Sequence, residues 1–152
     1  MKTQSNFEKL IKQNQSLLGI DQKQYEFTGE AGRSKSGSNK ETENGFHYSD
    51  FEYVQFFNIE ELPNRSFALL IILVQQFVNG LGEREGLQEI DFEFGPHDKG
   101  KSMDVEITFG VRESVYLVPV DNSPIEFNGK KWGFGESEYY IAQSLGALSV
   151  NA

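Results

Sequence analysis

The sequence predicts an α+β domain in which a mostly antiparallel sheet carries a central buried helix and an N-terminal helix on one face. Three observations support this fold class. Residues 4–18 place apolar side chains at helical spacing. Residues 87–111 contain two runs of alternating apolar and polar residues around the turn sequence "GPHDKGK", a pattern typical of an antiparallel hairpin. Asn128-Gly129, between Phe127 and Trp132, is a strong signal for a second hairpin with a two-residue turn.

The first elements are expected to be a helix, a short strand and a loop. Gly19 follows the helical residues 4–18 at the position where a glycine ends many helices. The segment "QYEFTG" alternates and predicts a short strand. Residues 29–45 contain no hydrophobic side chain other than Ala31, so we expect a long flexible loop there, which a partner would have to order.

The segment "GFHYSDFEYVQFFNIEEL" predicts the next strand. Val54 and Phe56 would point to one face of this strand. The apolar residues at odd-numbered positions would point to the other face, namely Phe51, Tyr53, Phe57 and Ile59. Both faces are therefore partly apolar. Such a strand either lies between two layers or keeps one face for a neighbouring subunit.

The most apolar segment, "RSFALLIILVQQFVNGLG", predicts a helix over residues 63–79. Pro63 is placed at the first helical position, because that position needs no amide donor. Apolar residues cover most of the circumference, which predicts a central helix buried on more than one side. The run is too short to span a bilayer, and the N-terminal residues lack the apolar segment of a signal peptide, so we expect a soluble protein.

The hairpin over residues 87–111 is expected to have one dry face and one acidic face. The acidic positions are Asp91, Glu93, Asp104 and Glu106. We expect a solvated face, and the alternatives are a subunit or partner interface and a catalytic pair of acids. After Gly110, "SVYLVPV" continues the second strand with both faces apolar, and Pro119 indicates an edge or a strand end.

Residues 1–135 are expected to form a single domain and residues 136–152 a C-terminal arm. The hairpin tip with Lys130 and Lys131 beside Trp132 is either a contact for an acidic neighbouring subunit or an ordinary hairpin end. The residues predicted for a subunit interface are Phe51, Tyr53, Val54, Phe56, Lys130, Lys131, Trp132, Tyr139 and Tyr140.

Composition and motifs give little support for an enzyme. The chain has 23 acidic and 14 basic residues and a net charge of −9, so it should repel phosphate groups, and it has no cysteine. Gly32 and Gly37 have the spacing of a nucleotide-binding loop, but Ser38 stands where the lysine is needed. His47 and His97 lie outside metal-binding spacings, so we expect solvated positions, with a metal or catalytic role as the alternative. No catalytic residue, cofactor or metal is expected.

The order of segments resembles a known family. An aromatic strand "EYVQFFNIEELP" precedes a helix "SFALLIILVQQFV" that ends in Phe77-Val78, and then come strands "EIDFEF" and "MDVEITFGVRESVYLVPV" and a hairpin "FNGKKW". Over residues 51–134 this pattern resembles the tail completion proteins of contractile-tailed bacteriophages, often called GpR. Residues 29–45 and the segment after Trp132 depart from the family pattern.

The resemblance implies a structural virion protein of the tail or neck, assembled in the bacterial cytoplasm without a membrane. Such proteins are similar to tail terminators, which form a ring, usually a hexamer, at the head-proximal end of the tail, stop polymerisation of tube and sheath, and join the tail to the head. The implied partners are further copies, tube and sheath proteins, and a neck or head-completion protein, with DNA passing through without specific binding.

Two alternatives remain at this point. One is a neck connector or a baseplate component of a phage or of a phage-derived contractile injection system. The other is a small ligand-binding or hydrolytic domain that uses His97, Asp98 and the acidic strands.

Overall fold

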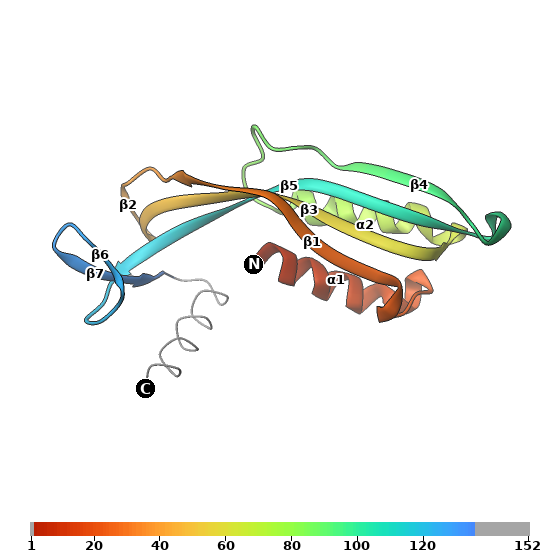
Figure 1. Cartoon of the computed structure of the whole chain (residues 1–152), viewed down its shortest axis with the longest axis horizontal. Coiled ribbons are helices and arrows are strands. Elements are labelled where there is room, and N and C mark those ends of the chain that lie inside the picture. Colours follow the sequence, from red (N-terminus) through yellow and green to blue (C-terminus); the bar gives the residue numbers. More distant parts are fainter. Residues whose placement is uncertain (1, 136–152) are drawn as a thin grey trace. The chain divides into compact units, whose positions relative to one another are not determined.

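The computed structural model describes residues 2–135 and shows an antiparallel sheet with two α-helices (Figure 1), which confirms the α+β class. The elements in chain order, with η for short 3-10 helices, are α1 (Lys2–Leu18), η1 (Gln22–Gln24), β1 (Tyr25–Ser36), β2 (Glu41–Thr42), β3 (Gly45–Pro63), η2 (Asn64–Ser66), α2 (Phe67–Asn79), β4 (Asp91–His97), η3 (Asp98–Gly100), β5 (Ser102–Pro119), β6 (Ile125–Phe127) and β7 (Lys130–Phe134). The strand order is β1-β3-β5-β7-β6, and in addition β2 pairs with β3 and β4 pairs with β5.

The described residues form two compact units, where the sequence suggested one domain over residues 1–135. The helical unit comprises Thr3–Gly32 and Tyr53–Arg112, and the strand unit comprises Lys2, Arg33–Glu52 and residues 113–135. Strands β1, β3 and β5 contribute residues to both units. At 12, 19 and 18 residues these strands are much longer than the usual five or six. The sequence predicted the length of β3 and β5, but for β1 it predicted only the short strand "QYEFTG".

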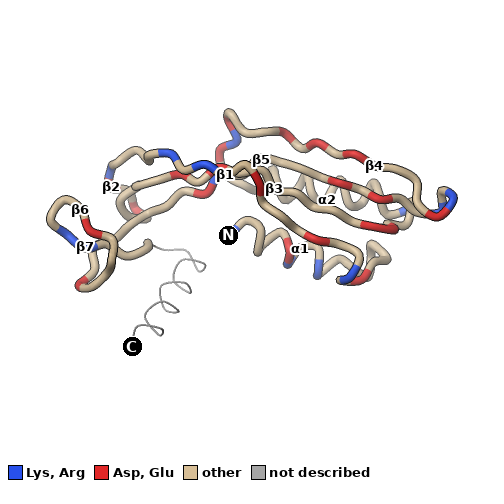
Figure 2. Tube along the Cα trace, in the orientation of Figure 1, with Lys and Arg blue, Asp and Glu red and all other residues tan. Residues whose placement is uncertain are grey.

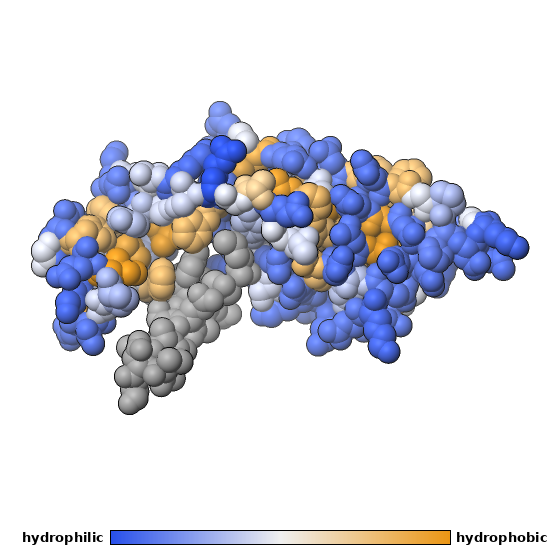
Figure 3. Space-filling view, in the orientation of Figure 1, coloured by the Kyte–Doolittle hydropathy of each residue, from blue (hydrophilic) through white to orange (hydrophobic). Residues whose placement is uncertain are grey.

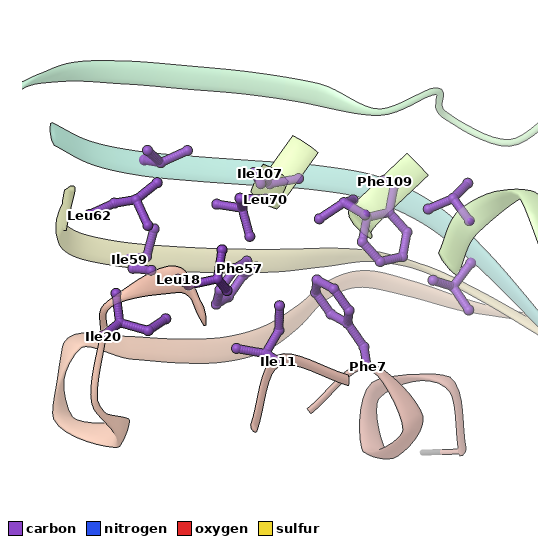
Figure 4. Packing of buried hydrophobic residues seen from close by; sticks show 14 of the residues in the cluster. Phe7, Ile11, Leu18, Ile20, Phe57, Ile59, Leu62, Leu70, Ile107 and Phe109 are labelled. Atoms are coloured by element: carbon purple, nitrogen blue, oxygen red, sulfur yellow. The ribbon is translucent and has the colours of Figure 1, made fainter. Parts of the chain in front are cut away.

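In the helical unit, both helices pack on the same face of the sheet. Phe7 of α1 lies at the centre of this core, with its ring centroid 5.3 Å from those of Phe27 and Phe57, 5.4 Å from that of Phe109 and 5.1 Å from that of Phe77 (Figure 4). Most of these pairs are edge-to-face, the favourable arrangement for aromatic rings. One aromatic side chain therefore joins α1 to β1, β3, β5 and α2.

Helix α1 ends as its sequence predicts. Gly19 has a φ of 73°, the Ile20 N–H donates to the Gln15 carbonyl at 3.0 Å, and the Gly19 N–H donates to the Ser16 carbonyl at 3.2 Å. These two bonds are those of a Schellman cap, in which a glycine accepts the left-handed conformation without strain.

Helix α2 begins later than predicted, at Phe67 rather than residue 63. Pro63 has an extended ψ of 134° and is the last residue of β3, so its predicted place at the first position of the helix is wrong. The η2 turn separates the two elements, because β3 stays paired in the sheet up to Pro63.

The predicted burial of α2 on more than one side is also wrong. Leu70, Val74 and Val78 are buried, whereas Leu69 is 37% and Ile72 is 56% exposed. The described part of the chain has one layer of helices on one sheet, so only the inward face of α2 is covered. Its outward face carries Leu69 and Ile72 beside the polar Gln75 and Gln76.

In the strand unit, the predicted flexible loop over residues 29–45 is wrong, because β1 continues to Ser36 and β2 follows. Backbone pairing of β1 with β3 needs no apolar side chain. Polar pairs across the two strands support it, with Ser34 Oγ 2.9 Å from Ser49 Oγ and Lys35 Nζ 2.9 Å from Glu52 Oε1. A polar sequence between turn residues can thus still form a paired strand.

The hairpin of β6 and β7 is confirmed. Asn128 and Gly129 have φ values of 50° and 69°, and Phe127 pairs with Lys130, as a two-residue turn of this kind requires. Trp132 stacks on Phe127 at 4.6 Å and donates its indole N–H to the Phe127 carbonyl at 3.1 Å. Pro119 is the last residue of β5, as expected for a strand end.

Candidate functional site

Strand β4 forms an edge of the sheet in the helical unit, because it pairs only with β5 among the described strands (Figure 1). Phe92 lies opposite Ile107 and Phe94 opposite Val105. Opposite residues of an antiparallel pair share a face, so both rings lie on the helix-covered face. Ile107 and Val105 are buried, yet Phe92 is 44% and Phe94 is 60% exposed.

Helix α2 contributes a third ring at this edge. The Phe67 ring centroid lies 5.6 Å from that of Phe92 and 5.2 Å from that of Phe94. We call Phe67, Phe92 and Phe94 the aromatic edge. Exposed aromatic groups beside the unpaired edge of a strand are typical of a surface that another chain covers.

The opposite face of the β4–β5 hairpin is acidic, as the alternation predicts. Figure 2 shows acidic residues in red along both strands. Glu93 lies directly opposite Glu106, and Asp104 lies opposite Gly95. Asp91 accepts a hydrogen bond from the Gln88 amide at 3.2 Å. Like charges opposite each other destabilise a hairpin modestly, so a cationic partner on this face would stabilise it. Whether the face is solvated or forms an interface stays a prediction.

Strand β3 adds apolar groups to this same face. Val54 and Phe56 alternate with the buried Tyr53, Gln55 and Phe57, so they point away from the helices. Both are half-buried. Figure 3 shows the molecule from the side on which the strands lie in front of α2. On this side, hydrophobic areas lie among hydrophilic ones.

His97 holds two carboxylates at one end of the acidic face. Its Nε2 lies 3.0 Å from Glu61 Oε1 and its Nδ1 lies 3.0 Å from Asp104 Oδ1. The hydrogen bond with Asp104 is the main cause that raises the pKa of His97, and the nearby charges of Asp104 and Glu61 add to it. The Glu61 backbone N–H, which donates to Asp104 at 3.1 Å, is the main cause that lowers the pKa of Asp104, followed by His97. Because both ring nitrogens face carboxylates, the charged imidazolium fits this position best.

His97 was expected in a solvated turn. The structure places it at the end of β4, directly before the η3 turn, with a side chain that is 32% exposed and contacts Glu61 and Asp104. Within residues 2–135, no group of three or more His, Asp and Glu side chains is arranged to hold a metal ion.

His47 lies in a second polar network, in the strand unit. Its Nδ1 accepts the Ser38 backbone N–H at 3.0 Å and lies 3.0 Å from Ser38 Oγ, and its Nε2 lies 2.7 Å from Asp50 Oδ1. The Ser114 hydroxyl donates to the same Asp50 oxygen at 2.7 Å. The order serine, histidine, aspartate is that of a hydrolytic triad.

The hydrogen bonds of this network fit a structural role better. In a triad, the nitrogen that faces the serine must be free to take its proton. Here that nitrogen of His47 also accepts the Ser38 backbone N–H, and the Asn39 N–H donates to the His47 carbonyl at 2.9 Å. The network therefore fastens the turn after β1 onto the start of β3.

The residues predicted for a subunit interface have different surroundings. Tyr53 is 7% exposed within the helical core, so its predicted place on an interface is wrong for the chain as folded. Phe51 is half-buried against the small cluster of Val115, Leu117 and Trp132. Val54 and Phe56, on the acidic face, keep exposed atoms.

The hairpin tip is only partly a surface. Trp132 is 4% exposed and supports the strand unit, so it too is not available to a neighbour. Lys130 is exposed, with its Nζ 6.0 Å from the Trp132 ring, and Lys131 is half-buried. Tyr139, Tyr140 and the rest of the predicted arm over residues 136–152 lie outside the described residues.

A groove of about 410 Å³ lies on the helical unit between α1 and β1. Its lining residues are Ser5, Glu8, Lys9, Lys12, Gln22, Tyr25 and Phe27. Burial is the main cause that raises the pKa of Tyr25, whose hydroxyl donates to Gln15 Oε1 at 3.0 Å. The charges in the groove have both signs, so they indicate no particular class of ligand.

In the part of the chain that the structure describes, neither helix has the length and apolarity needed to cross a bilayer. Comparison of the chain with protein-family models, with curated proteins and with solved structures finds no match.

Three features escaped prediction from the sequence. The exposure of Phe92 and Phe94 depends on β4 being an edge strand, and alternation alone does not distinguish edge from centre. The clusters around His97 and His47 join residues far apart in the chain. For His47 and Asp50, the spacing of three residues was the available signal.

Proposed function

We propose that this chain is a phage tail terminator or completion protein. It forms a ring at the head-proximal end of the tail, stops polymerisation of tube and sheath, and provides the joint to the head. The segment order over residues 51–134 suggests this role, and its partners would be further copies, tube and sheath proteins and a neck protein.

The observation that carries the proposal is the aromatic edge. Phe92 and Phe94 lie on the face that the core uses, next to an unpaired strand edge, and yet remain 44% and 60% exposed. The helices of the subunit do not fully cover these aromatic groups, so a neighbouring subunit can cover them.

The acidic face supports the second half of the proposal. Asp91, Glu93, Asp104 and Glu106 lie on a helix-free sheet face with His97 as a cation at one end. A ring whose inner wall is acidic repels the DNA backbone, so DNA would pass without being held.

The test is to add the purified chain to tail tubes of the phage or prophage that carries its gene, and to image the tube ends. The proposal expects rings at one end and an arrest of tube growth. A chain tagged in complete particles should appear between tail and head. Tubes that keep growing, with free ends, would contradict the proposal, and a tag at the baseplate would favour the baseplate alternative.

A small hydrolytic domain is the alternative that would use Ser38, His47 and Asp50, although their hydrogen bonds fit a structural role better. This alternative requires that Ser38→Ala and His47→Gln abolish function in the same way. The terminator proposal expects Ser38→Ala to leave tail completion intact, because the backbone N–H of residue 38 still binds His47.

A further inference from the structure

We propose that β4 of one copy pairs with the basic part of β1 of a second copy, so that the sheet continues from subunit to subunit. This inference rests on the proposed ring function. Strand β4 has one free edge, whose backbone groups can pair with another strand. The same event would cover part of the exposed Phe92 and Phe94 rings.

The charge of β4 selects the partner. Asp91 and Glu93 are exposed, and Glu93 makes no ion pair within the described residues. Two copies of β4 that paired with each other would bring these carboxylates together, and like charges across strands are destabilising. The edge that meets β4 should therefore be basic.

Strand β1 is the described edge that carries such residues. It lies at one end of the strand order, and Arg33 and Lys35 on it are exposed (Figure 2). Arg33 makes no ion pair with another described residue. The strand at the other end, β6, carries Glu126 instead, and the short β2 carries Glu41.

The side chains of β1 alternate between two faces. Lys35 reaches Glu52 at 2.9 Å, whereas Ser34 contacts the buried Ser49 at 2.9 Å. Along β3 the odd-numbered residues from Tyr53 to Ile59 are buried, and so is Ser49. Glu52 is even-numbered and therefore points to the solvent-facing side, and Lys35, which reaches Glu52, points to the same side.

Along β4, Asp91 and Glu93 point to the face opposite to that of Phe92 and Phe94. In a sheet continued between copies, acidic and basic side chains therefore meet on one face. On the other face the exposed rings meet the small Ser34.

The strand directions also agree. An antiparallel pairing of β4 with β1 of a neighbour would continue the antiparallel order of the sheet. The contact joins two different edges and is therefore heterologous, and such contacts close into rings or extend into filaments. Glu26 and Glu30, earlier in β1, would repel β4, so the contact is confined to the part around Arg33 and Lys35.

Charge reversal tests this pairing in solution by mass photometry and light scattering. Variant A is Asp91→Lys with Glu93→Lys, and variant B is Arg33→Glu with Lys35→Glu. Each variant alone should raise the dissociation constant of assembly by about 100-fold, because like charges then face each other. An equimolar mixture of A and B should regain wild-type assembly with alternating copies, as should the chain with all four substitutions.

The matched control is Lys9→Glu with Lys12→Glu on the exposed side of α1, which changes the net charge as much as variant B does and should assemble like the wild type. Variant B assembling alone would overturn the proposal in favour of another contact. A mixture of A and B that stays dissociated, or a wild-type chain that is monomeric at all concentrations, would also overturn it. Restored assembly without capping of tail tubes would instead refute the proposed function and leave the pairing standing.

Discussion

Replacement of the two exposed rings, Phe92→Ser with Phe94→Ser, should strongly weaken assembly. A phenylalanine side chain covers about 200 Å². With 44% and 60% exposed, the two rings offer about 200 Å² of apolar surface to a neighbour. At ~25 cal/mol per Å², burial of that area contributes up to about 5 kcal/mol to each subunit contact. Since ordering of the interface offsets part of this gain, we expect a loss of ~2–5 kcal/mol, a rise in the dissociation constant of roughly 30-fold to several thousand-fold.

The assay is the concentration dependence of mass in solution, measured beside urea unfolding of the dissociated chain. At the same coefficient, the buried parts of the two rings, about 190 Å² in all, contribute up to about 5 kcal/mol to folding, so the urea titration must show that the double variant is still folded. The control is Leu17→Ser, since Leu17 is 67% exposed and lies on α1 rather than on α2 or β4. A folded double variant that assembles with the wild-type dissociation constant would refute the reasoning.

Three further predictions concern stability. Phe7→Ala should lower the free energy of unfolding by ~3–5 kcal/mol in urea titrations, because its buried ring contacts four others. Leu17→Ala should lower it by less than about 0.5 kcal/mol, because Leu17 is exposed. Equal losses would contradict the core described. His97→Gln should destabilise the chain at about pH 5.5 and have little effect at about pH 9. Because the pKa of His97 is raised, its contribution to the free energy of unfolding is complete below its ordinary pKa of 6.5 and is lost as the pH rises through the raised value. Because the pKa of Asp104 is lowered, the contribution of Asp104 is complete above its ordinary pKa of 3.8. A loss of stability in His97→Gln that does not depend on pH would exclude the charged pair. Gly129→Ala should cost about 1 kcal/mol in thermal unfolding, because its φ of 69° strains any side chain, and an unchanged midpoint would argue against the turn.

The elements with strong local signals could be predicted from the sequence. Gly19 ends α1 where the helical period stops, the alternation around residues 91–111 specifies both faces of the β4–β5 hairpin, and Asn128-Gly129 specifies the β6–β7 turn. In each case the residues that determine the structure are neighbours in the chain.

The elements that depend on distant pairing could not be predicted. The polar end of β1 is a strand because β3 continues beside it, with contacts such as that of Lys35 with Glu52. The apolar outer face of α2, with Ile72, suggested burial within one chain, but apolarity does not tell whether the same chain or a neighbour provides the cover.

The candidate site was predicted only in part. Alternation placed Asp91 and Glu93 on a common face, but not the exposed edge beside them. Tyr53 and Trp132 were expected on an interface because aromatic residues suit both cores and interfaces, and their burial shows that they belong to the core.

The central claim is that this chain forms a ring at the end of a tail tube. The most direct test is cryo-electron microscopy of tail tubes from the phage or prophage that carries the gene, incubated with the purified chain. We predict a closed ring at one end of each tube, with neighbouring copies joined from β4 to β1. Uncapped tubes beside dispersed single copies of the chain would contradict the claim.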